Sequence, residues 1–194
     1  MRIRILVIFM LSVGTSLPID RALAAEQANP PGVTGTNWER HSRIIEIRTI
    51  YNEIQSKLAR KQLKYETKDY TVLPESCRGT YPMEYLALAT DSDGRVRVYT
   101  RAQRISHGDL LTTQYYYDNK GRLRFVYMTN KSNEYATIEN RVYLDEQGKV
   151  FWDVKTEAAK TTFGEITEDP WIIKETTNQG KVAEFKNAEI KCRE

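Results

Sequence analysis

A repeat of 27 residues is the feature that most constrains the fold of this chain. Three copies follow one another without a gap, and each opens with an Asp that is followed three residues later by a Gly. The copies begin Asp91-Ser-Asp-Gly-Arg-Val, Asp118-Asn-Lys-Gly-Arg-Leu and Asp145-Glu-Gln-Gly-Lys-Val. A D-x-x-G segment between strands is typical of a type I turn with a left-handed Gly, which closes a three-residue hairpin loop. The repeat therefore predicts β-hairpins over residues 91–171.

The turn also predicts how the strands pair. With Asp118 opposite Arg122, Tyr115 falls opposite Phe125, and the same register in each copy separates two faces of the sheet. One face is expected to be the apolar core, with Thr90, Val96, Tyr117, Leu123, Leu144 and Val150 in one row and Leu88, Val98, Tyr115, Phe125, Val142 and Trp152 in the next. The central row of the other face is expected to contain Ala89, Arg97, Tyr116, Arg124, Tyr143 and Phe151.

The strand pattern predicts a mainly β fold of the α+β class. We expect an antiparallel meander of about eight strands, near residues 84–90, 95–104, 110–117, 122–130, 135–144, 149–157, 166–176 and 181–190. A sheet of that length tends to curl, and closure into a barrel is the further alternative.

One amphipathic helix is predicted ahead of the sheet. The segment Thr36-Asn-Trp-Glu39 fits a capping box, in which the Thr hydroxyl and the Glu carboxylate bind free amides at a helix start. Apolar residues then recur at helical spacing up to about Tyr65, at Ile44, Ile47, Tyr51, Ile54 and Leu58. We expect this helix to cover the apolar face of the sheet.

The N-terminus has the composition of a secretory signal peptide. Arg2 and Arg4 precede a short apolar run, and the small-residue triplet Ala22-Leu-Ala24 follows. The run is shorter than the roughly 20 residues that span a bilayer. We therefore expect a signal peptide over 1–24, a flexible leader over 25–35 and a single domain over 36–194, with secretion to the periplasm or the medium.

Export bears on the two cysteines, Cys77 and Cys192, which both lie in the mature region. An oxidising compartment favours a disulfide between them, which typically contributes about 2–4 kcal/mol. An intermolecular bridge or two free thiols are the alternatives. Cleavage would also remove three arginines and one aspartate, lowering the net charge from +3 to +1. Since nucleic-acid binding calls for a clear cationic surplus, no such partner is predicted.

The segment Tyr117-Asp-Asn-Lys-Gly-Arg-Leu123 resembles the YD repeats of Rhs-type shells. The resemblance covers three short segments, and only the second copy has Tyr before Asp. It implies β-hairpin architecture and an extracellular setting, and it supplies no activity.

Catalytic motifs are absent from the sequence. His41 and His107 stand in no metal-binding or catalytic spacing and are expected at the surface, and no nucleophile or phosphate-binding motif occurs. Calcium would need several converging carboxylates, which Asp91, Asp93 and Asp109 do not assure. We predict no catalytic residue, metal site or cofactor.

The second face supplies the one candidate site, because guanidinium and aromatic side chains alternate along it. Such residues stack by cation–π contacts and are frequent in binding hot spots. An exposed binding patch is predicted at Arg97, Tyr116, Arg124, Tyr143 and Phe151. The alternative is that the helix or the C-terminal segment covers these residues.

The sequence thus favours an exported, non-catalytic binding or accessory protein, of the inhibitor, immunity or envelope type, with a protein or small-molecule partner. A carrier is one alternative, in which a curled sheet lined by Tyr115, Phe125 and Trp152 holds an apolar ligand. A hydrolase that uses scattered carboxylates, such as Glu84 or Glu134, is the other.

Overall fold

The computed structural model of the 194-residue chain describes residues 32–78, 83–104, 109–131, 137–157, 160–164 and 181–190. All of them belong to one compact unit, Gly32–Glu194. The predicted signal peptide, most of the leader, the strand expected over 166–176, His107 and Cys192 lie outside the described residues.

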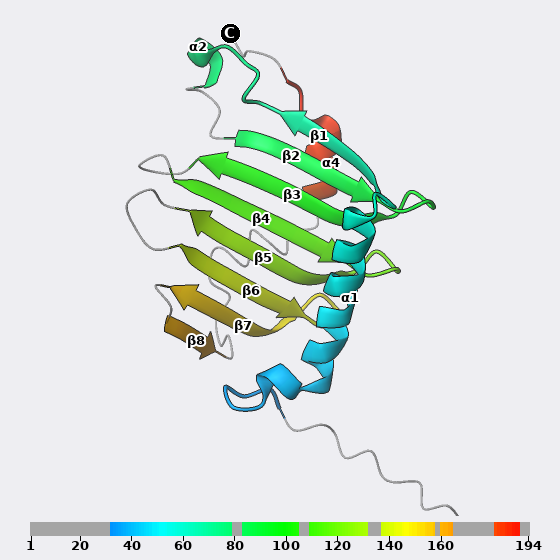
Figure 1. Ribbon diagram of the computed structural model, residues 1–194, viewed down its shortest axis with the longest axis vertical. Coiled ribbons are helices and arrows are strands. Elements are labelled where there is room, and N and C mark those ends of the chain that lie inside the picture. Colours follow the sequence, from blue (N-terminus) through cyan, green and yellow to red (C-terminus); the bar gives the residue numbers. More distant parts are fainter. Residues whose placement is uncertain are drawn as a thin grey trace, which may run out of the picture. The chain divides into compact units, whose positions relative to one another are not determined.

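Eight strands form one antiparallel sheet in chain order (Figure 1). They are β1 (Lys64–Asp69), β2 (Met83–Thr90), β3 (Val96–Arg104), β4 (Leu110–Tyr117), β5 (Leu123–Lys131), β6 (Ile138–Leu144), β7 (Val150–Glu157) and β8 (Lys160–Gly164). The strand order is linear, so β1 and β8 are edges and the sheet is open rather than closed into a barrel. The predicted mainly β meander is confirmed.

The three D-x-x-G turns have the predicted geometry. Gly94, Gly121 and Gly148 have φ of 74°, 76° and 80°, which places each of them in the left-handed region. In every copy the Asp amide donates to the carbonyl of the residue after the Gly, and the Gly amide donates to the Asp carbonyl. The Asp side chain accepts two further backbone amides, so the turn is closed by its own sequence.

The predicted register fails one residue beyond each turn, because every hairpin contains a β-bulge there. In the second copy Tyr117 pairs with Leu123 as predicted, but Tyr116 pairs with Phe125, and Arg124 is the extra residue. The same shift occurs in the first and third copies, where the extra residues are Arg97 and Phe151. A bulge reverses the direction of the side chains that follow it.

The bulges give the sheet two apolar faces instead of one. We call them the helix face, which packs against α1 (Ser42–Ala59), and the opposite face, which packs against α4 (Lys181–Asn187). The first predicted row keeps its place, since Val96, Tyr117, Leu123, Leu144 and Val150 all pack on the opposite face. The second row is divided: Leu88, Tyr115 and Val142 stay on the opposite face, whereas Val98, Phe125 and Trp152 lie on the helix face.

Helix α1 runs across the strands (Figure 1) and buries Ile44, Ile47 and Ile54 against the helix face. A short 3-10 helix, η1 (Trp38–Arg40), precedes it, and the predicted capping box does not form, because η1 has no side-chain cap. His41 caps α1 instead: its Nδ1 accepts from the Arg43 amide at 3.3 Å. His41 is also buried, so its predicted surface position was wrong.

Other elements also differ from the sequence prediction, among them α4 and β1. Residues 181–187 form α4 rather than a strand, and Phe185 of this helix is buried in the opposite-face core. Strand β1 begins where the sequence predicted the end of a helix, and no strand was expected there. Its first four residues are exposed, so no alternation of apolar residues marked it as a strand.

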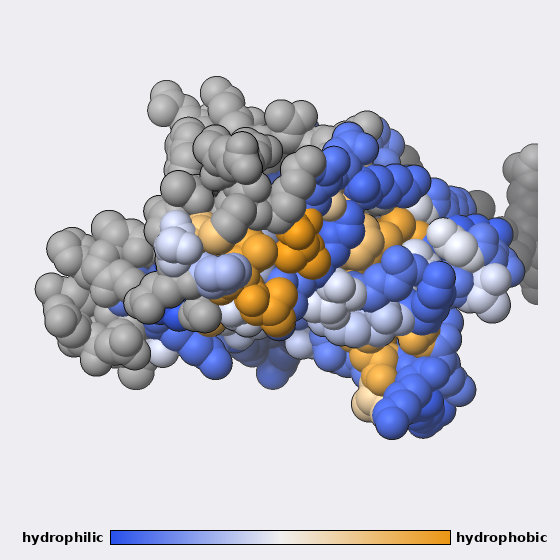
Figure 2. All heavy atoms as spheres, turned by 90° about the horizontal axis from the view of Figure 1, so that it is seen from above, coloured by the Kyte–Doolittle hydropathy of each residue, from blue (hydrophilic) through white to orange (hydrophobic). Residues whose placement is uncertain are grey.

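The end of the sheet at β1 carries several exposed apolar side chains. Figure 2 views the molecule from this side, where hydrophobic residues lie between hydrophilic ones. Tyr65, Val72 and Ile190 are 57%, 71% and 43% exposed, and they belong to β1 and to the segments that follow β1 and α4. Single exposed apolar residues are normal on protein surfaces. None of the described helices is both long and apolar enough to cross a membrane.

Cys77 is 6% exposed in α2 (Glu75–Arg78) and belongs to the opposite-face core, as does Phe185. The Nζ of Lys68 donates to the Ala188 carbonyl at 2.6 Å, which ties the segment after α4 to β1. This packing brings the chain shortly before Cys192 to the same core as Cys77. The Cys77–Cys192 disulfide stays a prediction.

Candidate functional site

The predicted binding patch is covered by α1. Tyr116 and Tyr143 are 0% and 2% exposed, Arg97 and Arg124 are both 3% exposed, and Phe151 is half-buried. The prediction of an exposed surface was wrong, because the residues face the helix that was expected on the other side of the sheet. The alternative, that the helix covers the row, holds.

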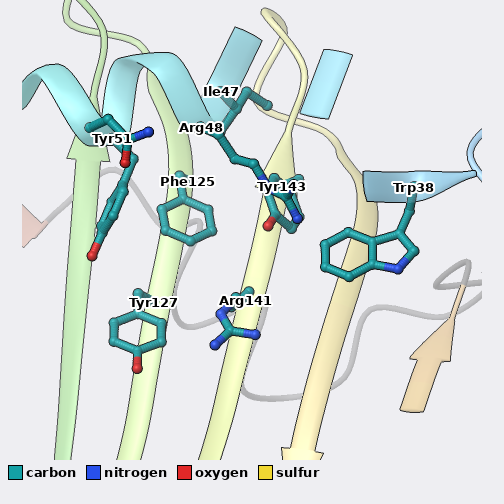
Figure 3. Close-up of a pocket in the computed structure, with 9 residues that line it drawn as sticks. Trp38, Ile47, Arg48, Tyr51, Phe125, Tyr127, Arg141 and Tyr143 are labelled. Atoms are coloured by element: carbon teal, nitrogen blue, oxygen red, sulfur yellow. The ribbon is translucent and has the colours of Figure 1, made fainter. Parts of the chain in front are cut away.

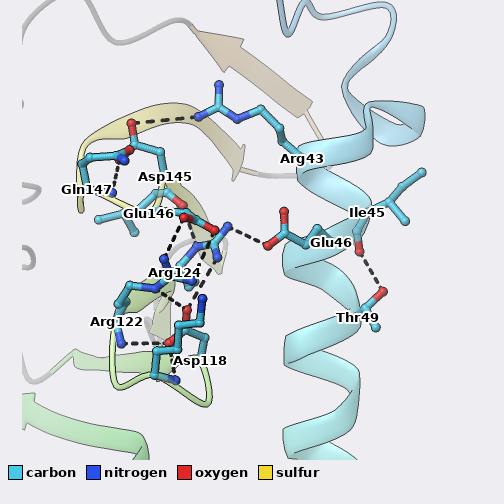
Figure 4. A network of polar contacts seen from close by, with 12 residues as sticks. Arg43, Ile45, Glu46, Thr49, Asp118, Arg122, Arg124, Asp145, Glu146 and Gln147 are labelled. Carbon is cyan, nitrogen blue, oxygen red and sulfur yellow. Dashed lines mark hydrogen bonds and ion pairs between the residues drawn. The ribbon is translucent and has the colours of Figure 1, made fainter. Parts of the chain in front are cut away.

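The buried arginines of this row attach α1 to the sheet. The Nε of Arg124 donates to the Leu144 carbonyl at 3.3 Å, and its Nη2 lies 3.0 Å from the Glu46 carboxylate on α1 (Figure 4). Arg97 repeats the arrangement with the Tyr117 carbonyl at 3.2 Å and Glu53 at 3.7 Å.

In the third copy the arginine is on the helix and not in the bulge: the Arg43 guanidinium of α1 lies 3.8 Å from the ring centroid of the bulge residue Phe151. All three contacts join the helix to a bulge, so these side chains have a structural role.

The turn aspartates are also structural, but they do not form a regular ladder of exposed cross-strand ion pairs. Only Asp118 binds its cross-strand partner, Arg122, at 2.7 Å, whereas Arg95 binds Asp93. Burial raises the pKa of the Asp118 carboxyl, but hydrogen bonds from Arg122 and from the Lys120 amide outweigh burial, and the pKa lies below its ordinary value. Asp118 therefore stays ionised inside the network of Figure 4.

Beside the buried row lies a cleft of about 330 Å³ between α1 and strands β5 and β6 (Figure 3). It falls at the lower end of the range of small-molecule sites. The cleft is lined by Trp38, Ile47, Arg48, Tyr51, Asn52, Phe125, Tyr127, Arg141 and Tyr143.

Aromatic rings form most of the cleft wall and hold one another in place. The Phe125 ring packs 5.1 Å from Tyr143 and, edge-on, 5.6 Å from Tyr51. Burial raises the pKa of Tyr143, and a hydrogen bond from Arg48 lowers it by less. Burial also raises the pKa of Tyr127, with the nearby Glu139 carboxylate adding to the shift. Both hydroxyls are therefore neutral at neutral pH and act as hydrogen-bonding groups rather than as bases.

Two arginines supply the charge of the cleft. The Arg48 guanidinium stacks over Trp38 at 4.7 Å and donates from Nη1 to the Glu39 carbonyl at 3.1 Å. Arg141 lies 5.9 Å from the Tyr127 ring centroid and binds Glu139 at 2.6 Å. Among the residues that the structure describes, Arg141 thus has a carboxylate partner, whereas Arg48 has none within 4.0 Å.

Sequence reasoning missed this cleft. Only Tyr143 belonged to the predicted site, and Phe125 was assigned to the core. The lining residues before and within the helix end at Asn52, and those on the strands begin at Phe125, more than 70 positions later. No sequence motif joins these two groups. On the helix, Ile47 and Tyr51 were predicted on one apolar stripe, and the spacing of Arg48 and Asn52, one helical turn apart, indicates that these two also face one way.

Nothing in the described part of the chain groups three or more His, Cys, Asp or Glu residues as a metal ion would need. The cleft offers apolar ring faces, neutral hydroxyls and one cation that no carboxylate of the described segments approaches, a set suited to binding. Comparison with protein-family models, curated proteins and solved structures gave no match.

Proposed function

We propose that this chain is an exported, non-catalytic binding protein that takes a small ligand into the cleft between α1 and strands β5 and β6. The observation that carries the proposal is a cleft with aromatic walls on a rigid frame. Phe125 and Tyr143 are buried and project from a continuous sheet, and Tyr51 projects from α1. Walls that are already ordered lose little conformational entropy when a ligand binds.

The other functions considered have less support. The residues expected to line an apolar carrier do not share a face, because Tyr115 belongs to the opposite face of the sheet, whereas Phe125 and Trp152 belong to the helix face. Glu84, one of the carboxylates considered for a hydrolase, forms an ion pair with Arg104, and Glu134 lies outside the described residues. An inhibitor or immunity protein would present a face to its partner, but the face proposed for that purpose is buried under α1.

The cleft can be tested by NMR with a set of small aromatic fragments of differing charge. We expect some fragments to shift the backbone amide signals of Arg48, Tyr127 and Arg141 in ¹⁵N-labelled mature protein, while signals of the opposite face stay unchanged. Fragments that shift only residues remote from the cleft, or none that bind, would contradict the proposal.

A matched pair of variants separates a filled cleft from a general effect on α1. Asn52 is an exposed residue of the cleft wall, so Asn52→Trp should fill the cleft and abolish fragment binding. Ile45 is 49% exposed on the same helix and does not line the cleft, so Ile45→Trp should bind like the wild type. Equal loss in both variants would assign the effect to the helix rather than to the cleft.

A further inference from the structure

We propose that the ligand is a small aromatic carboxylate, whose ring packs among the aromatic walls and whose carboxylate binds Arg48. This inference rests on the proposed function, since it names the chemical class that the same cleft would take. It follows from three features: the fixed orientation of Arg48, the lack of a carboxylate partner for Arg48 among the described residues, and the size of the cleft.

Arg48 is held in one orientation from two sides. Its guanidinium stacks over the Trp38 ring at 4.7 Å, and Nη1 donates to the Glu39 carbonyl at 3.1 Å. A guanidinium has five N–H donors in a rigid plane, so the contacts with Glu39 and Tyr143 leave donors to spare. A planar donor group fixed by stacking suits a planar carboxylate, which can bind two N–H groups at once.

The charges around the cleft favour an anion. Arg124, Arg97 and Arg141 each lie within 4.0 Å of a Glu carboxylate, whereas among the described residues Arg48 lies that close to none. The second cation of the cleft, Arg141, is neutralised by Glu139 at 2.6 Å. A single cation beside aromatic walls is shielded from solvent on one side, which strengthens its attraction for a carboxylate.

The size of the cleft restricts the ligand further. A volume of about 330 Å³ is at the lower end for small-molecule sites, which suits a single ring system rather than a long chain. Inorganic anions would meet Arg48 but would leave the rings of Tyr51 and Tyr127 uncovered. An aromatic carboxylate can bind Arg48 through its carboxylate and pack its ring against the aromatic side chains of the cleft.

Benzoate and benzamide test the inference, because they share a ring and differ in charge. We expect NMR titration of the mature protein to show benzoate binding about tenfold or more tightly than benzamide, as for a charge-assisted hydrogen bond. Arg48→Gln should remove this preference, and Arg48→Lys should retain part of it. Arg60→Gln is the matched control, since Arg60 is the exposed C-cap of α1 and does not line the cleft.

A gain of affinity provides a test that a damaged fold could not imitate. Glu139→Gln should free Arg141 as a second cation and strengthen benzoate binding severalfold, with benzamide binding unchanged. Equal affinities of wild-type protein for benzoate and benzamide would overturn the inference while leaving the cleft as a binding site. A preference that survives Arg48→Gln would overturn the role of Arg48. If neither compound nor any other fragment shifts the cleft signals, the proposed function fails as well.

Discussion

Replacing Arg124 by Met should destabilise the protein more than removing its ion-pair partner on α1. The Arg124 side chain is 4% exposed and binds three groups: the Leu144 carbonyl, the Glu46 carboxylate and, at 3.7 Å, Asp118. Met keeps most of the apolar volume, so the change reports mainly on these polar contacts. It therefore tests whether the bulge arginines hold the helix to the sheet.

The magnitude follows from what each partner loses. A buried carbonyl left without its donor costs about 1–3 kcal/mol. The Glu46 side chain is 54% exposed, so its ion pair contributes no more than about 1 kcal/mol. Asp118 keeps Arg122 at 2.7 Å and is not left as an unpaired charge. We expect Arg124→Met to lower the free energy of unfolding by about 2–4 kcal/mol.

Urea unfolding of Arg124→Met, Glu46→Gln and the double variant measures these terms. Glu46→Gln should cost less than about 1 kcal/mol, and the coupling between the two changes should be equally small. The reasoning would be refuted if Glu46→Gln cost as much as Arg124→Met. It would also fail if Arg124→Met were neutral, since the carbonyl would then not depend on the guanidinium.

Four further outcomes are expected. Gly121→Val should lower stability by about 1–2 kcal/mol in thermal unfolding, because φ is 76° at this position. No neighbouring atom lies within 4 Å of an added Cβ, so the loss would report backbone strain alone, and Gly121→Asn should lose less. Burial raises the pKa of Asp153, so the folded state loses stability as pH rises from about 4 through that pKa, and Asp153→Asn should melt higher than the wild type at pH 7 but not at pH 3. The lowered pKa of Asp118 has the opposite effect on stability: the ionised carboxylate stabilises the folded state above about pH 4, and this stabilisation is lost in acid. Asp118→Asn should therefore melt at a lower temperature than the wild type at pH 7, with a smaller difference at pH 3. Mass spectrometry of the unreduced mature protein should find no alkylatable thiol at Cys77 or Cys192 and a chain that starts near Ala25, whereas two modified thiols would contradict the bridge.

The hairpins could be predicted from sequence because the information is local. Each turn needs only an Asp whose side chain accepts two nearby amides and a Gly that accepts a positive φ, and both are visible in D-x-x-G. The bulge that follows left no such mark. Leu123, Phe125 and Val126 are all apolar, so either register buries apolar side chains, and alternation alone could not distinguish them.

The position of the helix and the cleft depended on that register. Once Phe125 moves to the helix face, Tyr116 and Tyr143 are beneath α1 instead of exposed, and a site predicted from their exposure is lost. The cleft also brings Trp38 and Arg48, from the segments before and within α1, to the same cavity as Tyr127 of β5, an arrangement that no local pattern encodes. The residue types of the site were partly anticipated, since the arginine and tyrosine side chains do gather on this face.

The bulges and the helix share a common step. Glu46 and Glu53 of α1 are seven residues apart, a rise of about 10.5 Å, whereas Arg124 and Arg97 are one repeat apart on strands separated by about 9.6 Å. Between the first and second copies, two turns of helix therefore correspond to one hairpin of the sheet, whereas in the third copy Phe151 is contacted from Arg43, only three residues before Glu46.

Such a match restricts how proteins of this design can change length. A fourth 27-residue hairpin would present a bulge residue beyond the reach of α1 unless about seven residues were also added to the helix. Duplication of a hairpin alone would leave its bulge side chain without a contact on α1. Insertions or deletions of a hairpin should therefore be accompanied by a matching change in the length of the helix, at a distant place in the gene.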